Sequence, residues 1–470
     1  MNRSLFTIED ILAATGGKIQ RRGPQGVFGV AVDSRKVEPG DLFLALRGAR
    51  VDGHDYVAQA LRRGAHWALV EPNRTLNLGD AQGGLTEVPD PWRALGDLAI
   101  YHRRRYPVPV VAVTGSIGKT CTKDLLASVL GQGFCVLYNR GNENSDIGLP
   151  LTLFRLQRHH QLAVLEMAMR GSGQISYLTH IAPPNIGVIT NIDSTHMELL
   201  GSIEAIAQAK AELLDALPLD GTAVLNGDSP WVRKVAHRAP GTILWFGLEQ
   251  GCDFTAKDIE SHGEHGVYFT LVTPQGQRKI ELPVPGRHMV CNALAAAAVG
   301  VTMGLNLDDI VQGLAVASVS GMRGQIHRSH ELIILNDAYN AHPQSMLAAL
   351  ELLQELEGER KIAVLGSMLE LGDDTCLAHR RVGQAVAAGK VDALITVGEE
   401  GATMVEAAVE AGLSRNSVCL CADNRQAQQC LRRWLKARDT VLVKGSRGLG
   451  MEEIVRWLQA GLWRGSCQCL

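Results

Sequence analysis

A short segment containing two glycines could bind the phosphates of a nucleotide. It consists of Thr114, Gly115, Ser116, Ile117, Gly118, Lys119 and Thr120. The glycines would let backbone N–H groups face phosphate oxygens, and Lys119 would neutralise charge on the β- and γ-phosphates. The hydroxyl of Thr120 is placed to bind Mg²⁺. The loop is shorter than the general P-loop, because Val113 stands where the first glycine would be.

The residues on either side of this loop favour the same interpretation. The apolar run Val108–Val113 is typical of a buried parallel strand, and 121–130 has a helical pattern. A helix that starts directly after the loop would direct its positive amino-terminal dipole at the phosphates. A glycine-rich turn with a solvated lysine is the alternative, and the strand and helix make it the weaker one.

Two further side chains could complete a metal site. Glu166 ends the apolar run 162–165, and His196 follows the run 186–190. The carboxyl ends of parallel strands meet at one edge of a sheet, where ligands bind. Taken singly, each of the two residues is more typical of an ordinary surface loop, so the sequence leaves both interpretations open.

Apolar runs alternate with helical patterns over most of the 470 residues, which predicts an α/β protein with parallel sheets. We expect three domains. The first spans 1–85 and ends in a turn-rich run, the second spans 86–320, and the third, Rossmann-like domain spans 321–470. Alternating apolar positions and turn glycines predict antiparallel strands across 242–285.

The composition excludes several classes of protein. Apolar residues make up 46% and charged residues 20%, so the chain can bury a large core. A net charge of −3 argues against a nucleic-acid binder. No apolar stretch is long enough to span a bilayer, and 1–17 lacks the features of a signal peptide. We therefore expect a cytoplasmic protein whose ten cysteines are reduced.

Several further motifs accompany the short TGxxGKT loop, in order along the chain. They are Asp33-Ser34-Arg35, 39–43, 52–54, 139–150, 190–192 with His196, 201–212, 336–345, 369–372 and 444–448. Together they resemble the motifs of the Mur ligases of peptidoglycan synthesis, which are themselves similar to folylpolyglutamate synthases, and the short loop has the form found in that superfamily. Among these, Asp337-Ala338-Tyr339-Asn340-Ala341 with Pro343 and Ser345 is the match most specific to one branch of the family.

The resemblance implies a uridine-nucleotide domain, a central ATPase domain and a carboxyl-terminal ligase domain. That branch adds D-alanyl-D-alanine to UDP-MurNAc-tripeptide, using ATP to form an acyl phosphate that the dipeptide amine attacks. It implies two Mg²⁺ ions, one on Thr120 and one using Glu166 with His196. It also implies a CO₂-derived carbamate on Lys210, although Ala-Gln-Ala-Lys-Ala-Glu by itself is typical of an exposed helix lysine. We expect a monomer without nucleic-acid or membrane partners.

The resemblance also implies roles for individual binding residues. Asn292 would contact adenine, although a helix N-cap is the competing role for it. Arg323 and Asp337 would close on the phosphates and ribose of ATP. Ser34 and Arg35 would contact the uridine diphosphate. The peptide substrates would be bound by Asn139, Asn144, Tyr339, Asn340, Lys444 and Arg447.

Other functions remain open at this point. A Mur ligase that adds the third amino acid usually has a DNPR motif, and this chain has only Asp423-Asn424-Arg425. A folylpolyglutamate synthase would lack the uridine domain, and a GTP-dependent switch would need an NKxD motif that is missing. A P-loop ATPase or small-molecule kinase could use the same phosphate loop.

Overall fold

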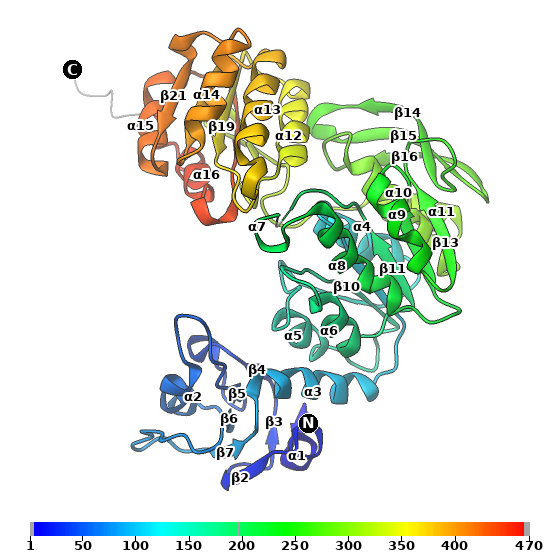
Figure 1. Ribbon diagram of the computed structural model, residues 1–470, viewed down its shortest axis with the longest axis vertical. Coiled ribbons are helices and arrows are strands. Elements are labelled where there is room, and N and C mark those ends of the chain that lie inside the picture. Colours follow the sequence, from blue (N-terminus) through cyan, green and yellow to red (C-terminus); the bar gives the residue numbers. More distant parts are fainter. Residues whose placement is uncertain (1–3, 196, 465–470) are drawn as a thin grey trace. The chain divides into compact units, whose positions relative to one another are not determined.

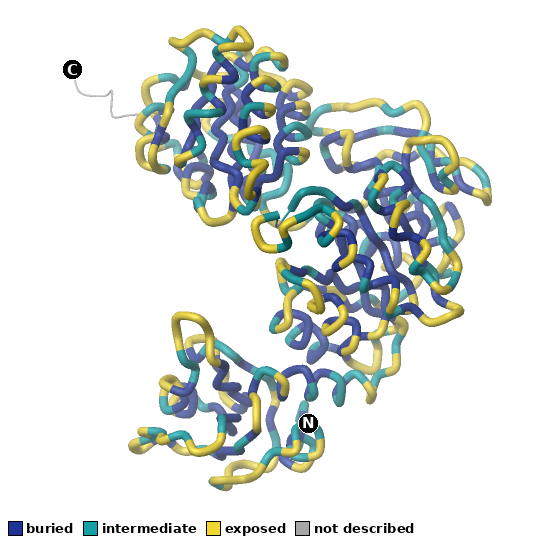
Figure 2. The backbone as a smooth tube through the Cα atoms, viewed as in Figure 1, coloured by how far each residue is buried: buried dark blue, intermediate teal, exposed yellow. Residues whose placement is uncertain are grey.

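The computed structural model describes residues 4–195 and 197–464 (Figure 1). The chain forms two compact units, each built from several stretches of sequence. The first consists of Met1–Val110, Cys135–Met167 and Ser176–Pro184, and the second of Val111–Phe134, Ala168–Ile175 and Asn185–Leu470. Figure 2 colours the buried residues dark blue, and many residues of the parallel strands described below are among them.

The first unit contains a five-stranded sheet with the order β2-β7-β6-β5-β4. β4 to β7 are parallel and β2 is an antiparallel edge strand. One face of the sheet packs on helix α2 (Val57–Arg62). The turn-rich run near residue 85 contains β7. The strands are β2 (Lys18–Arg21), β4 (Val30–Ala31), β5 (Leu42–Leu44), β6 (Trp67–Val70) and β7 (Gly84–Glu87).

Helices of the first unit begin at residues suited to capping. Thr7 and Asp10 form a capping box at α1 (Ile8–Thr15). Asp90 caps α3 (Pro91–Arg104), and the proline occupies the first helical position, where no N–H is needed. The same unit also holds two strands that pair in parallel, β9 (Val136–Tyr138) and β10 (Leu162–Glu166). The short helix α5 (Gly148–Leu153) lies between them in the sequence.

In the second unit, four parallel strands lie in the order β13-β12-β11-β8. Their bounds are β8 (Val110–Thr114), β11 (Ile186–Ile189), β12 (Thr222–Asn226) and β13 (Thr242–Phe246). The prediction of antiparallel strands was wrong for 242–246, because this run pairs in parallel with β12. It is confirmed further on, where β14 (Thr255–Ser261), β15 (Val267–Thr273) and β16 (Gly276–Leu282) form an antiparallel sheet.

The carboxyl-terminal sheet of the second unit has the order β17-β18-β22-β19-β20-β21 and is parallel except for β17. Side chains alternate between its two faces. Along β18, Ile333 and Leu335 face α12, α13 and α14, whereas Leu332 and Ile334 face α15 and α16 (Figure 1). This arrangement confirms the predicted doubly wound fold. The strands are β17 (Gln325–Ser329), β18 (Leu332–Asn336), β19 (Arg360–Gly366), β20 (Ala393–Val397), β21 (Val418–Cys421) and β22 (Asp439–Lys444). The helices are α12 (Pro343–Glu355), α13 (Thr375–Ala388), α14 (Gly401–Glu410), α15 (Asn424–Trp434) and α16 (Glu452–Gln459).

One prediction about the cysteines was wrong. Cys419 on β21 forms a disulfide with Cys430 on α15, so not all cysteines are reduced. Cys421 lies beside them, with its Sγ 3.7 Å from that of Cys419. The packing of α15 on β21 brings these sulfurs together, and the sequence spacing alone does not reveal it.

Candidate active site

The phosphate loop connects β8 to α4 (Lys119–Leu130), as predicted. Its backbone depends on two glycines with positive φ, 152° at Gly115 and 83° at Gly118. A Cβ on Gly115 would lie 1.9 Å from Oγ1 of Thr190, and one on Gly118 would lie 2.8 Å from Oδ1 of Asn292. Both positions therefore require glycine for space as well as for conformation.

Residues after β11 hold the loop in shape. The backbone N–H groups of Ser116 and Ile117 donate to Oδ1 of Asn191 over 3.1 and 2.8 Å. Oγ1 of Thr190 donates to the carbonyl of Ile117 over 2.6 Å. We assigned no role to Thr190 and Asn191 from the sequence. Their position at the carboxyl end of a strand beside β8 is the signal that could have identified them.

Two lysines converge on one carbonyl of this loop. Nζ of Lys119 donates to the carbonyl oxygen of Gly115 over 2.8 Å, and Nζ of Lys210 donates to the same oxygen over 3.0 Å. Lys210 lies on α8 (Ile203–Asp215) and is only 2% exposed, which excludes the alternative of an exposed helix lysine. Burial, and then the charge of Lys119, hold the pKa of Lys210 well below its usual value.

Asn292 lies beside the loop in the first turn of α10 (Met289–Thr302). His288 is the N-cap residue of this helix, so the competing role of Asn292 as a cap is excluded. Its Oδ1 accepts a 3.1 Å hydrogen bond from Oγ1 of Thr122 on α4, and both side chains are buried. The structure therefore places Asn292 against the phosphate loop.

Helix α4 also holds the segment that precedes the carboxyl-terminal sheet. Oδ2 of Asp124 accepts hydrogen bonds from the backbone N–H and hydroxyl of Ser320 over 2.8 and 2.7 Å. Asp124 is buried and forms an ion pair with Lys123. This connection, which the sequence did not predict, ties the helix of the phosphate loop to the residues just before Arg323.

At the carboxyl ends of β18 and β22, the structure brings together six residues predicted to bind ATP or peptide. The carboxylate of Asp337 pairs with Lys444 over 2.5 Å and accepts from the backbone N–H of Gly324. Nζ of Lys444 also donates to the carbonyl of Asn340 over 3.0 Å. The centroid of the Tyr339 ring lies 3.7 Å from the guanidinium carbon of Arg323 and 5.9 Å from that of Arg447. These contacts form a cationic group around Tyr339 and Asn340.

In the first unit, two predicted substrate-binding asparagines contact Glu166 at the end of β10. Oδ1 of Asn139 accepts from the backbone N–H of Glu166, and Nδ2 of Asn144 donates to its Oε1, both over 2.6 Å. Glu166 is 1% exposed, and Asn139 is also buried. The two asparagines therefore fix the position of a buried carboxylate.

The first unit also contains Ser34 and Arg35, in a short 3₁₀ helix after β4. Ser34 is buried, and its hydroxyl donates to Gln59 over 2.9 Å. Arg35 is exposed and forms two 2.9 Å hydrogen bonds with the carboxylate of Asp33. The hydrogen bonds from Arg35 lower the pKa of Asp33 to about 2. Arg35 thus presents an exposed guanidinium whose position is fixed by its ion pair with Asp33.

The predicted magnesium ligands offer suitable donors where they are described. Thr120 supplies a hydroxyl in the first turn of α4, and Glu166 supplies a carboxylate at a strand end; both are buried. Hard oxygen donors of this kind suit Mg²⁺. His196, the third predicted ligand, lies outside the described residues.

The fold and these residues define a class of nucleotide-dependent α/β enzymes with a phosphate loop. Three family models match successive parts of the chain: "Mur ligase family, catalytic domain" at 27–103, "Mur ligase middle domain" at 113–300 and "Mur ligase, glutamate ligase domain" at 322–447. The chain belongs to the Mur ligase family, and it is an ATP-dependent ligase.

Individual relatives match over nearly the whole chain. A UDP-N-acetylmuramoyl-tripeptide–D-alanyl-D-alanine ligase of Bacillus subtilis (strain 168) is 37% identical over 433 residues, which cover 92% of this chain and 93% of the relative. A crystal structure of MurF from Acinetobacter baumannii is 32% identical, has a TM-score of 0.87 and covers 97% of this chain and 99% of its own. A crystal structure of MurF from Thermotoga maritima in complex with ADP is 29% identical and has a TM-score of 0.79. The match covers 92% of this chain and 97% of that structure's chain. Within residues 4–195 and 197–464, no helix has the length and apolar character needed to cross a membrane.

Proposed function

We propose that this protein joins D-alanyl-D-alanine to UDP-N-acetylmuramoyl-tripeptide, with hydrolysis of ATP to ADP and phosphate. The observation that carries the proposal is the cationic group around Tyr339 and Asn340, because it assembles the motif most specific to this branch of the family. Relatives of that name, similar over more than nine tenths of the chain, support it.

The chemistry requires an activated carboxylate. The terminal carboxylate of the tripeptide attacks the γ-phosphorus of ATP, which gives an acyl phosphate and releases ADP. The amine of D-alanyl-D-alanine then attacks the acyl carbon, the amide bond forms, phosphate leaves and the amine loses a proton. Phosphoryl transfer depends chiefly on positioning and charge neutralisation. Lys119 and the backbone of the phosphate loop supply both to the transferred phosphate.

We further propose that Thr120 holds one Mg²⁺ and that Glu166 with His196 holds a second. These ions would neutralise phosphate charge when bound. The low pKa of Lys210 favours the neutral amine, which can add to CO₂ to give a carbamate and a proton. This step would replace a cation with an anion beside Lys119.

The remaining binding roles are proposals of the same kind. Ser34 and Arg35 would bind the uridine diphosphate, and the exposed, fixed guanidinium of Arg35 suits a phosphate. Asn292 would contact adenine, and Arg323 and Asp337 the phosphates and ribose. Domain boundaries near 85 and 320 and a cytoplasmic location remain predictions. The peptides would contact Asn139, Asn144, Tyr339, Asn340, Lys444 and Arg447.

Phosphate release from ATP, measured with and without each substrate, tests the function. We expect release only when UDP-MurNAc-tripeptide and D-alanyl-D-alanine are both present, and a product heavier by the dipeptide less water in mass spectrometry. Lys119→Ala is the control for a contaminating activity and should abolish release. Turnover with UDP-MurNAc-dipeptide and a diamino acid instead would identify a third-residue ligase. Release without any acceptor would identify a plain ATPase.

A further inference from the structure

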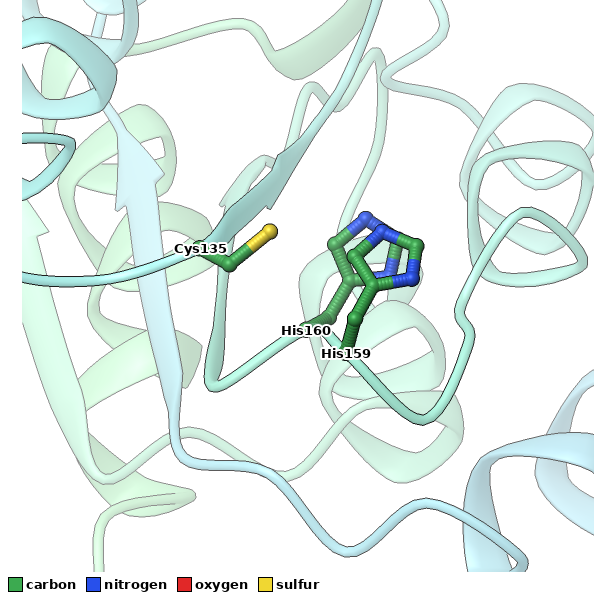
Figure 3. A group of neighbouring side chains, drawn as sticks. All are labelled: Cys135, His159 and His160. Atoms are coloured by element: carbon green, nitrogen blue, oxygen red, sulfur yellow. The ribbon is translucent and has the colours of Figure 1, made fainter.

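A cysteine and two histidines lie together in the first unit, at a place that the proposed ligase reaction does not use. Cys135 immediately precedes β9, and His159 with His160 lies just before β10. Figure 3 shows the Cys135 sulfur directed toward the two imidazole rings. One ligand atom from each residue lies within 4.8 Å of the others. Zn–S and Zn–N bonds of about 2.0–2.3 Å place the ligand atoms of a tetrahedral site roughly 3.5 Å apart, so small side-chain movements would bring these three atoms to one ion.

The backbone holds these residues together without a metal. The N–H of Cys135 donates to the side-chain oxygen of Gln161, and the N–H of Gln161 donates to the carbonyl of Cys135, both over 2.8 Å. The ring centroids of His159 and His160 are 4.2 Å apart. The two strands then continue in parallel register from Val136 and Leu162. Ordering the three side chains therefore needs little rearrangement of the chain.

We propose that Cys135, His159 and His160 bind a thiophilic divalent cation of the zinc class. Thiolate and imidazole donors select borderline-soft transition metals over Mg²⁺ or Ca²⁺. Three protein ligands leave one position of a tetrahedral site for water. Both histidines line a pocket of about 450 Å³, which gives that water room.

The contacts of His160 indicate an exchangeable site. Its Nδ1 accepts a 3.0 Å hydrogen bond from the N–H of Gln157, so binding of a metal at Nδ1 displaces this bond. Gln157 is exposed, so water can replace the lost acceptor. With three ligands and one displaced hydrogen bond, the affinity falls below that of a four-ligand structural zinc site.

The position of the proposed metal site in the sheet predicts a structural role for the metal. Cys135 and His160 lie at the amino ends of β9 and β10, whereas Asn139 and Glu166 lie at the carboxyl ends of the same strands. A bound cation would fasten the two strands at the end away from Glu166. We therefore expect it to stabilise the first unit, and we expect the ligase reaction to proceed without it.

Cobalt(II) is a spectroscopic probe for such a site. Titration of the chelator-treated full-length protein should give one equivalent of Co²⁺ with visible d–d bands of tetrahedral geometry and a near-ultraviolet thiolate-to-cobalt band. Zn²⁺ should remove both signals, and it should raise the thermal unfolding temperature. Cys135→Ser should abolish the thiolate band, and His159→Gln or His160→Gln should weaken binding by about tenfold or more.

Two cysteine variants serve as matched controls. Cys376→Ser removes another exposed thiol. Cys421→Ser removes one sulfur from the other group of neighbouring cysteines, which consists of Cys419, Cys421 and Cys430. Both should keep the cobalt spectrum. Circular dichroism without metal should show that Cys135→Ser is folded. The proposal is overturned if wild-type protein gives no tetrahedral spectrum, or if the thiolate band survives Cys135→Ser, whether or not it disappears in Cys421→Ser.

Discussion

Replacing Gly115 with alanine should destabilise the phosphate loop through two separable effects. The first is conformational, because φ is 152° and a side chain in this region costs about 1–3 kcal/mol. The second is steric, because the new Cβ would lie 1.9 Å from Oγ1 of Thr190. Overpacking of this kind costs about 1–3 kcal/mol. Together they give a loss of about 2–6 kcal/mol in the free energy of unfolding.

Thr190→Ala separates the two effects. Alone, it removes the hydrogen bond from Thr190 to the carbonyl of Ile117 and should cost about 0.5–1.5 kcal/mol. In the double variant the steric clash with Oγ1 is absent, but the conformational cost at Gly115 remains. The double variant should therefore be about 1–3 kcal/mol more stable than the sum of the single effects predicts.

Gly201→Ala is a matched control for the conformational effect. Its φ is 77°, and nothing lies within 4 Å of the position that a Cβ would take. Urea unfolding followed by circular dichroism measures all four variants, and calorimetry measures ADP binding. We expect Gly115→Ala to weaken ADP binding and Gly201→Ala to leave it unchanged. Single effects of Gly115→Ala and Thr190→Ala that add to within about 0.5 kcal/mol would refute the steric reasoning.

Three further predictions concern buried ionisable groups. Labelled ¹³CO₂ should give a carbamate NMR signal that disappears in Lys210→Arg, and that variant should lose turnover while it still binds ADP; an unchanged spectrum would exclude the carbamate. Asp337→Ala should cost about 3–5 kcal/mol because it leaves Lys444 buried without its carboxylate, and adding Lys444→Met should recover part of this loss in urea unfolding. Burial lowers the pKa of His379 below its ordinary 6.5, and its Nε2 accepts from the N–H of Met368. As pH falls through 6.5 the unfolded chain binds the proton first, so stability should decrease more steeply in wild type than in His379→Leu.

The parts of the site that depend on neighbouring sequence could be predicted. The apolar run before Thr114, the glycines and the helical pattern after Thr120 are all local, and together they specify a strand, a loop and a helix. The cationic group around Tyr339 has no local pattern of this kind. Arg323 precedes β17, whereas the other members lie at or after the ends of β18 and β22, and only the resemblance to the family indicates that these separate segments act together.

Other features depend on packing that no local pattern records. Lys210 lies in a stretch rich in alanine, where a lysine is normally exposed, and it is buried because α8 packs against the phosphate loop. The sequence around Asn292 also suits an N-cap, but α10 begins earlier, at Met289, so Asn292 lies inside the helix. The disulfide between Cys419 and Cys430 joins a strand to the helix after it, and its partners could not be chosen from ten cysteines by spacing.

The two lysines at Gly115 place positive charge at the phosphate loop that a bound anion would neutralise. Lys119 and Lys210 come from different helices, yet both donate to the same carbonyl oxygen. Two ammonium groups that share one carbonyl oxygen repel each other strongly when they are buried. This repulsion contributes, after burial itself, to the low pKa of Lys210. A polyphosphate bound at the loop would offset the charge of Lys119, and a carbamate on Lys210 would replace the repulsion with attraction. Lys119→Met should therefore raise the pKa of Lys210, and the pH at which labelled carbamate forms should shift upward with it; a carbamate signal with the same pH dependence in both proteins would show that burial alone sets the protonation of Lys210.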